Sequence, residues 1–253
     1  MTIDLTSLRL TKPVAGQPSS AKVRDILAAE DRPVCVAFSG GKDAIATEIA
    51  MQESGVDTVL AHLYLIPGKV PGETLGFIED GLKRLEDHWQ KPIHRYPHPS
   101  FYRWLNNFVF QAPEHCAVIE AAKLPSPTYE QIWALIRYDL GLDPDTWVAD
   151  GVRAADSLVR RASIKKHGAM KVNSRKVSPI WDWLQGSVYE VIEKSDIPLP
   201  VDYELFDRSF DGIDHRFLAP MKDRFPEDFA QVLNWFPLAE LELVRHDMRK
   251  DGA

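Results

Sequence analysis

The residues with the clearest chemical meaning are Ser39-Gly40-Gly41-Lys42-Asp43, which directly follow the apolar run "PVCVAF" (33–38). Paired glycines let the backbone adopt positive φ values and approach an oxygen-rich group closely. Consecutive N–H groups in such a turn, together with the amino end of a following helix, attract anions. Lys42 adds a full positive charge and Ser39 a hydroxyl donor. The stretch predicts a phosphate-binding loop. The alternative is a tight turn whose glycines serve geometry alone.

Two better-known phosphate-binding patterns, G-x-x-x-x-G-K-[ST] and G-x-G-x-x-G, do not occur at this position. Asp43 has two interpretations, because a carboxylate can hold Mg²⁺ together with phosphates or stabilise the amino end of a helix. Ala44 follows Asp43 and offers no hydroxyl. Thr47 lies one helical turn after Asp43, so we expect it to point the same way and to compensate in part.

Positive charge gathers between residues 153 and 176 of a chain whose formal net charge is -7. The basic residues of this stretch are Arg153, Arg160, Arg161, Lys165, Lys166, Lys171, Arg175 and Lys176. Guanidinium groups suit the recognition of oxyanions, and basic patches bind nucleic acid through its phosphates. The alternative for the lysines is a charged loop in water. Asp156 and Ser157 can cap the next helix, and Asp156 can also orient Arg153.

Neither sulfur nor histidine forms a cluster in the sequence. Cys35 lies in the apolar run, where a buried structural thiol is expected, and Cys116 is the only other cysteine. Two thiols cannot hold an ordinary iron–sulfur cluster, so none is expected. His94 and His98 are separated by a proline and do not predict a metal site.

The elements that position these residues alternate between strands and helices, which predicts an α/β fold with a parallel sheet and helices on both faces. We expect strands at 33–38, 57–66, 92–96 and 146–150. We expect helices at 43–54, 75–89, 101–110, 128–141 and 185–195, and another that starts at Pro226. The predicted division is a lead-in at 1–20, a nucleotide-binding domain at 21–180 and a mainly helical C-terminal extension at 181–253.

The ends and composition of the chain set further expectations. The first 20 residues lack the basic and apolar regions of a signal peptide, and no apolar run approaches the length of a membrane span. We therefore expect a cytoplasmic protein without a membrane partner. Trp181 and Trp183 are expected to pack in the core.

The Ser39–Asp43 string resembles the pyrophosphate loop (PP-loop) of the adenine nucleotide α-hydrolase superfamily, written SGGxD followed by Ser or Thr. The phosphoadenosine phosphosulfate reductase branch is the most similar. Its Glu-Thr element resembles "VPGETLGFIEDGLKRL" (70–85), and its Gly-x-Arg-x-x-x-Ser-x-x-Arg segment resembles "VADGVRAADSLVRRA" (148–162). Its Pro-x-x-x-Trp and Ile-Pro block resembles residues 177–214. The resemblance spans roughly residues 32–214 and implies a HUP-like (Rossmann-like) sheet.

The resemblance also implies a function, which is an enzyme that binds ATP with Mg²⁺, cleaves it between the α- and β-phosphates and activates an unknown acceptor. Lys42, Asp43 and Arg153 would be catalytic, and Asp43 would hold the metal. The nucleotide-binding set would be Ser39, Gly40, Gly41, Lys42, Asp43, Thr47, Leu63, Tyr64, Leu65, Gly151, Arg153, Ser157, Arg160 and Arg161. In this set the backbone of 63–65 would contact adenine.

Two alternatives remain open at this point. The first is a sulfonucleotide reductase-like enzyme, although the C-terminal cysteine that such reductases use is absent here, because no cysteine follows Cys116. The second is a non-catalytic nucleotide-binding subunit of a nucleic-acid modification system, with nucleic acid or another protein as its partner. Ala44 and the basic segment favour this second alternative.

Overall fold

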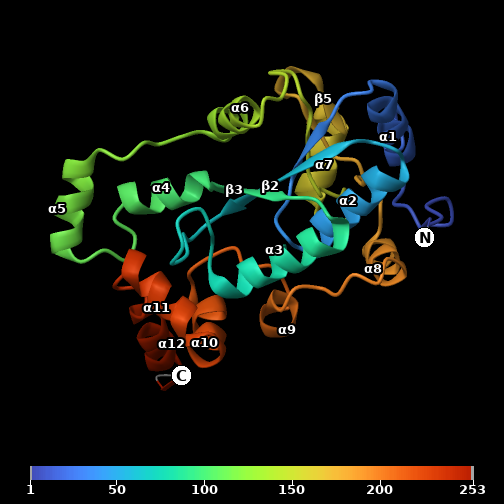
Figure 1. Ribbon diagram of the computed structural model, residues 1–253. Coiled ribbons are helices and arrows are strands. Elements are labelled where there is room, and N and C mark those ends of the chain that lie inside the picture. Colours follow the sequence, from blue (N-terminus) through green and yellow to red (C-terminus); the bar gives the residue numbers. More distant parts are fainter. Residues whose placement is uncertain (1, 252–253) are drawn as a thin grey trace. The chain divides into compact units, whose positions relative to one another are not determined.

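The computed structural model describes the backbone of residues 2–251 and the side chains of residues 2–248. Figure 1 labels many of the elements along the ribbon. The strands of the described chain are β1 (Val34–Ala37), β2 (Thr58–Tyr64), β3 (Ile93–Pro97), β4 (Val148–Ala149), β5 (Met170–Lys171) and β6 (Lys176–Val177). Its α-helices are α1 (Ser20–Ala29), α2 (Lys42–Glu53), α3 (Gly76–Trp89), α4 (Pro99–Asn106), α5 (Pro113–Ala122), α6 (Tyr129–Asp139), α7 (Leu158–His167), α8 (Gln185–Lys194), α9 (Asp202–Phe206), α10 (His215–Arg224), α11 (Pro226–Trp235) and α12 (Leu241–Asp251).

The six strands form one mostly parallel sheet in the order β3-β2-β1-β4-β6-β5. Val36 of β1 pairs in parallel with Leu60 of β2 and with Ala149 of β4, whereas β5 is antiparallel to β6. The predicted α/β class with a largely parallel sheet is therefore confirmed. Strands β2 and β3 lie on one side of β1 and β4 lies on the other, so the strand order reverses between β1 and β4. Open α/β sheets bind ligands outside the carboxyl ends of the strands at such a reversal.

Local signals explain where several helices begin and end. The helix expected at 101–110 instead begins at Pro99, because His98 caps it and proline is favoured at the first helical position. It stops at Asn106, and Phe108 and Phe110 have positive φ values of 53° and 51°. α1 was not predicted, although Ser19, at the end of the expected lead-in, accepts a hydrogen bond from the Lys22 N–H at its start.

The chain forms two compact units, each built from three stretches. Unit 1 is the chain up to His62 with Leu85–His94 and Trp133–Leu199. Unit 2 is Leu63–Arg84, Arg95–Ile132 and the chain from Pro200 onward. The domain boundaries expected at residues 20 and 180 stay predictions. From α8 onward the described residues form helices and no strand.

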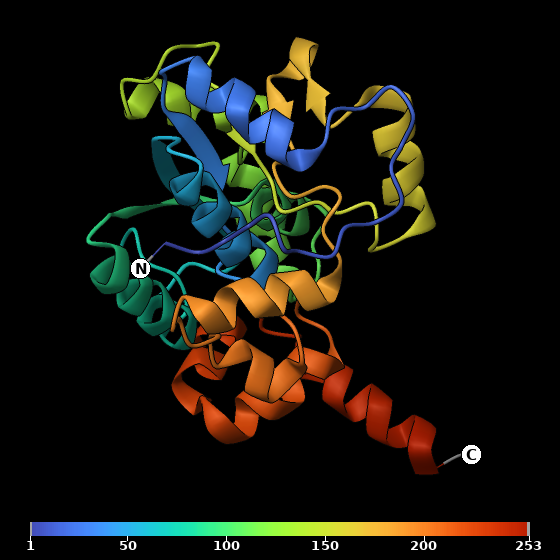
Figure 2. The ribbon, with the colours of Figure 1, turned by 90° about the vertical axis from the view of Figure 1, so that its right-hand side faces the viewer.

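Unit 1 is organised around β1 and α2, which pack against each other. Val34, Cys35 and Val36 are buried, as expected for a central parallel strand. Helix α2 is buried from Ala44 to Met51 and packs closely on α8. The N-terminal segment is also attached to unit 1, because Leu10 forms an isolated antiparallel β-bridge with the buried Trp183. Figure 2 shows the same blue segment running alongside α7 at the right of the view.

Unit 2 has its own apolar core, which is rich in aromatic residues. Phe77 stacks on Phe225 with 5.0 Å between ring centroids. The buried members of this core are Ile66, Leu75, Phe77, Phe101, Leu105, Ile213, Leu218, Met221, Phe229, Val232, Phe236 and Ala239. Among the helices that the structure describes, none is long and apolar enough to span a bilayer.

Candidate functional site

The glycine loop connects the carboxyl end of β1 to the amino end of α2. Gly40 has a φ of 77°, in the left-handed region that favours glycine. Gly41 is the N-cap of α2, and no side chain caps this helix. The Gly41 N–H donates to Ser39 Oγ at 3.3 Å. The loop thus combines an exposed hydroxyl with the uncapped start of a buried helix, which is an arrangement that attracts anions.

Asp43, in the first turn of α2, is paired with two cations. Lys42 Nζ lies 2.7 Å from Asp43 Oδ2, and Arg153 Nε lies 2.9 Å from Asp43 Oδ1. The second contact has ion-pair distance, but neither of its atoms has an aligned hydrogen-bond partner. We therefore regard it as an electrostatic contact without a directed hydrogen bond. The loop brings one carboxylate and two cations together.

Arg153 comes from the loop after β4 and is 3% exposed. Its Nη2 lies 2.6 Å from Asp156 Oδ1, and its backbone N–H donates to Asp156 Oδ2 at 3.3 Å. Its Nη1 is buried without a hydrogen-bond partner among the described residues. A buried guanidinium N–H without a partner is costly, so this donor favours an acceptor beyond those that the described residues supply.

Gly151 explains how the loop after β4 reaches α2 so closely. A Cβ at this position would lie 2.9 Å from the backbone carbonyl carbon of Asp43 and 2.9 Å from its Cβ. Only glycine fits this approach without a shift of backbone. Gly151 therefore contributes through close packing that places Arg153 beside Asp43.

Asp150 is a site-forming residue that the sequence analysis did not single out. Its Oδ1 accepts hydrogen bonds from Ser178 Oγ at 2.7 Å and from the Val152 N–H at 3.1 Å. Burial raises the pKa of Asp150. Through these hydrogen bonds the carboxylate links the end of β4 to the residue after β6 and stabilises the turn that precedes Arg153. The sequence signal that could have identified Asp150 is an acidic residue directly after an apolar strand.

Thr47 does not present its hydroxyl to the loop. The side chain is fully buried, and Oγ1 donates to the Asp43 carbonyl oxygen at 2.8 Å. Ala44 is also buried, at 3% exposure. The hydroxyl of Thr47 therefore stabilises the first turns of α2, and the partial compensation for Ala44 that we expected from it finds no support in this geometry.

The other basic candidates occupy different places around α7. Ser157 caps α7 by accepting from the Arg160 N–H at 3.1 Å, as its sequence position suggested. The Arg160 guanidinium pairs with Asp156 and is thereby linked to Arg153. Arg161 instead donates from Nη2 to the Lys12 carbonyl oxygen at 3.1 Å. The structure brings Arg153 to the loop, and it directs Arg161 to the N-terminal segment.

The residues expected to contact adenine belong to unit 2. Leu63 and Tyr64 end β2, and the Tyr64 carbonyl accepts from the His98 N–H at 2.9 Å. Leu65 packs against the core of unit 2. One backbone acceptor of this stretch is therefore already used within unit 2, and the adenine contact stays a prediction.

The two thiols differ in burial. Cys35 is fully buried in β1, and burial raises the pKa of its thiol to about 12. A thiol with so high a pKa is not a nucleophile near neutral pH. Cys116 is half-buried within α5.

A pocket of about 120 Å³ lies at the amino ends of β1 and β2, where it is lined by the end of α1 and by the turns before these strands. Ligands of open α/β sheets bind at the opposite, carboxyl ends of the strands. The glycine loop therefore remains the candidate site.

A comparison with models of known protein families gave no match to this chain, and a comparison with curated proteins gave no match either.

Proposed function

We propose that this chain is a PP-loop enzyme with a HUP-like sheet that binds ATP, cleaves it between the α- and β-phosphates and transfers AMP to an acceptor. The observation that supports this most is the contact between Arg153 and Asp43. A buried guanidinium from the end of β4 reaches the first turn of α2, beside the paired glycines and at the reversal of strand order. The segments that follow β1 and β4 thus both bring positive charge to the glycine loop, as Lys42 and Arg153.

In this proposal the loop and the amino end of α2 bind the leaving pyrophosphate. Ser39 contributes its hydroxyl, the glycines allow the backbone to approach, and Lys42 neutralises charge. Arg153 stabilises the charge that develops on the phosphoryl oxygens, because preorganised donors lower the energy of a charged transition state. Its unpartnered Nη1 is the donor available for this role.

Asp43 is the residue that would hold Mg²⁺, since carboxylate and phosphate oxygens are the ligands this ion prefers. In the free chain both oxygens of Asp43 face cations. A polyphosphate is more strongly charged than one carboxylate, so Lys42 would turn toward it and release Asp43 Oδ2 for the ion, while Arg153 stays in place. Bound Mg²⁺ would neutralise part of the charge on the phosphates.

The test is incubation of the purified chain with α-labelled ATP and Mg²⁺, with AMP and pyrophosphate separated from ADP and phosphate. We expect AMP to be the labelled product. ATP binding is measured in parallel by calorimetry, and Lys42→Ala is expected to weaken it by at least about tenfold, because a charged hydrogen bond is worth roughly 1.5–3 kcal/mol.

The matched control is Lys22→Ala, which removes an exposed lysine of α1 and is expected to leave ATP affinity unchanged. Labelled ADP as the main product would contradict cleavage between the α- and β-phosphates. ATP affinity that is the same in Lys42→Ala and in the unaltered chain would contradict the assigned loop.

A second candidate is a nucleotide-binding subunit without catalytic activity, as part of a nucleic-acid modification system. The observation in its favour is α7, where Ile164 is the one buried residue and Lys165 and Lys166 are exposed. Leu158 and Val159 are 87% and 78% exposed on the same helix. Tight ATP binding without release of pyrophosphate would support this candidate.

A sulfonucleotide reductase-like activity would need a reactive thiol. Cys35 is buried, with a raised pKa, so Cys116 is the thiol on which this alternative depends. Reduction of an adenylyl sulfate with a thiol donor that is lost in Cys116→Ser would favour this alternative over ATP cleavage.

A further inference from the structure

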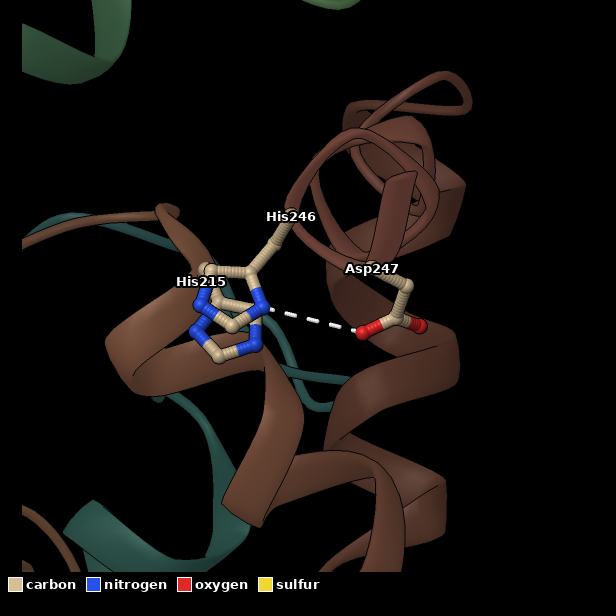
Figure 3. Close-up of side chains that lie close together, drawn as sticks. All are labelled: His215, His246 and Asp247. Atoms are coloured by element: carbon tan, nitrogen blue, oxygen red, sulfur yellow. Dashed lines mark ion pairs between the residues drawn. The ribbon is translucent and has the colours of Figure 1, made fainter. Parts of the chain in front are cut away.

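A group of metal-binding side chains lies within unit 2, where α10 and α12 pack against each other. His215 is the first residue of α10, and His246 and Asp247 lie on α12. Figure 3 shows the two imidazole rings one over the other, with the Asp247 carboxylate directed toward His246. The ring centroids are 3.4 Å apart and the ring planes differ by 19°.

The potential ligand atoms of these three residues converge. One nitrogen from each imidazole and one carboxylate oxygen all lie within 4.8 Å of one another. His246 Nδ1 lies 3.6 Å from Asp247 Oδ1, which is too long for a hydrogen bond. This nitrogen is shielded from water and has no hydrogen-bond partner among the described residues. A shielded imidazole nitrogen without a partner costs free energy that a metal bond would recover.

Asp247 differs from two other acidic residues of α12 and the start of α10, which are paired with arginines. Asp214 is neutralised by Arg216, whose Nη2 lies 2.8 Å from Asp214 Oδ2. Glu242 is neutralised by Arg245, with 2.6 Å between Nη2 and Oε1. In the part of the chain that the structure describes, Asp247 has no Lys or Arg partner and its side chain is 74% exposed. Two imidazoles and one such carboxylate form a site that favours a cation.

We propose that His215, His246 and Asp247 bind a divalent first-row transition metal such as Zn²⁺. Two imidazole nitrogens and one carboxylate oxygen are a common zinc-binding set, with water in the fourth position. Binding requires the two rings to rotate out of their stack, so that a nitrogen lone pair of each points to the same ion. The metal would fix α12 to α10. The residues involved are separate from the glycine loop, so this proposal does not rest on the proposed function.

The experiment uses the full chain, freed of any polyhistidine tag and treated with a chelator. Co²⁺ is titrated in, its visible absorption is followed, and Zn²⁺ is then used to displace it. We expect saturation at one ion per chain and a rise in Tm with Zn²⁺. His215→Ala and His246→Ala are each expected to lower the affinity at least about tenfold, because the loss of even an outer partner of a metal site typically costs that much.

Two controls separate this site from binding to scattered histidines. His115→Ala and His167→Ala remove exposed histidines of α5 and α7 and are expected to leave affinity and stoichiometry unchanged. Asp247→Asn keeps the shape of the side chain and tests the carboxylate, with circular dichroism to verify folding. The proposal is overturned if Co²⁺ binding does not saturate, or if His215→Ala and His246→Ala bind the ion as tightly as the two control variants.

Discussion

At the scale of single residues, the candidate site depends on charges that compensate one another in the free chain. Asp43 pairs with Lys42 and Arg153, and Arg153 also pairs with Asp156. Burying a guanidinium requires such partners, because an unpaired buried charge costs several kcal/mol. The arrangement keeps Arg153 in place before any nucleotide arrives, which is the preorganisation that the proposed function needs.

We predict that Gly151→Ala destabilises the protein by roughly 1–3 kcal/mol, the usual cost of overpacking. The new Cβ would lie 2.9 Å from the backbone carbonyl carbon of Asp43, and a backbone atom cannot move aside cheaply. Denaturant unfolding measures the difference. The control is Gly186→Ala in α8, where the added Cβ meets nothing within 4 Å apart from its chain neighbours and the backbone of its own helix. Equal stability of Gly151→Ala and the unaltered chain would show that the loop after β4 is not so closely packed.

His98 leads to a prediction about pH. Its Nδ1 accepts from the Ser100 N–H at 3.0 Å at the start of α4, so the neutral ring carries its proton on Nε2, 2.8 Å from the Tyr129 hydroxyl. Burial, with a smaller effect from Arg103, lowers the pKa of His98 from 6.5 to about 4. Folding therefore favours the neutral ring. The contribution of the neutral ring to folding stability, on the order of 3 kcal/mol, is complete above pH 6.5 and is lost as the pH falls from there through about 4.

The variant His98→Asn tests this contribution, since asparagine can cap a helix but does not titrate. Unfolding free energies measured near neutral pH and near pH 4 should show a larger acid loss in the unaltered chain than in the variant. An identical loss in both proteins would mean that other groups dominate the acid response.

At the scale of elements, α2 and α7 differ in the interactions that keep them in place. Helix α2 is buried from Ala44 to Met51 between β1 and α8, so the glycine loop is attached to a rigid helix. Helix α7 buries only Ile164 and is held by the Ser157 cap and the contacts of Arg161 with the N-terminal segment. A helix with so little buried surface and a basic last turn favours an acidic partner.

We predict that the double change Lys165→Glu and Lys166→Glu weakens any binding of DNA or RNA by this chain. The affinity should fall, and the slope of log K against log salt should become shallower by about 2, because each lysine contact with a phosphate releases about one counterion. Fluorescence anisotropy at several salt concentrations measures both. Lys22→Glu with Lys123→Glu is the matched control, since both lysines are exposed outside α7. Equal losses in the two double variants would indicate that overall charge, rather than α7, determines binding.

At the scale of the whole molecule, the chain runs repeatedly between its two units, and neither unit is a continuous segment. Unit 1 carries the glycine loop and Arg153, and unit 2 carries an aromatic core and the proposed metal site. The part of the chain after Leu199 supplies seven of the twelve buried core residues of unit 2, from Ile213 to Ala239. This core therefore depends on parts of the chain that are far apart in the sequence.

We predict that a chain ending at Leu199 does not form the core of unit 2. The remaining core residues, among them Leu75, Phe77 and Leu105, would lose their partners, and Phe77 would lose the ring of Phe225. We expect strong binding of an apolar dye and the loss of a single cooperative unfolding transition. A shortened chain that unfolds as cooperatively as the full one would show that unit 2 does not need these helices.

The sequence by itself determined the features that depend on neighbouring residues. The apolar run before Ser39, the paired glycines, the Ser157 cap and the start of α11 at Pro226 could all be predicted, because strand patterns, turn glycines and helix caps act over a few positions. The largely parallel sheet followed from the alternation of strands and helices.

Only the tertiary structure decided which distant residues meet. It gave the direct contact between Arg153 and Asp43, which the resemblance had only grouped in one site, and it showed that Thr47 is turned into the core. It also added Asp150 to the site and stacked His215 on His246. Such contacts depend on strand order and on how apolar surfaces are buried together. A local pattern carries no information on either, because the same motif can be folded next to many different partners.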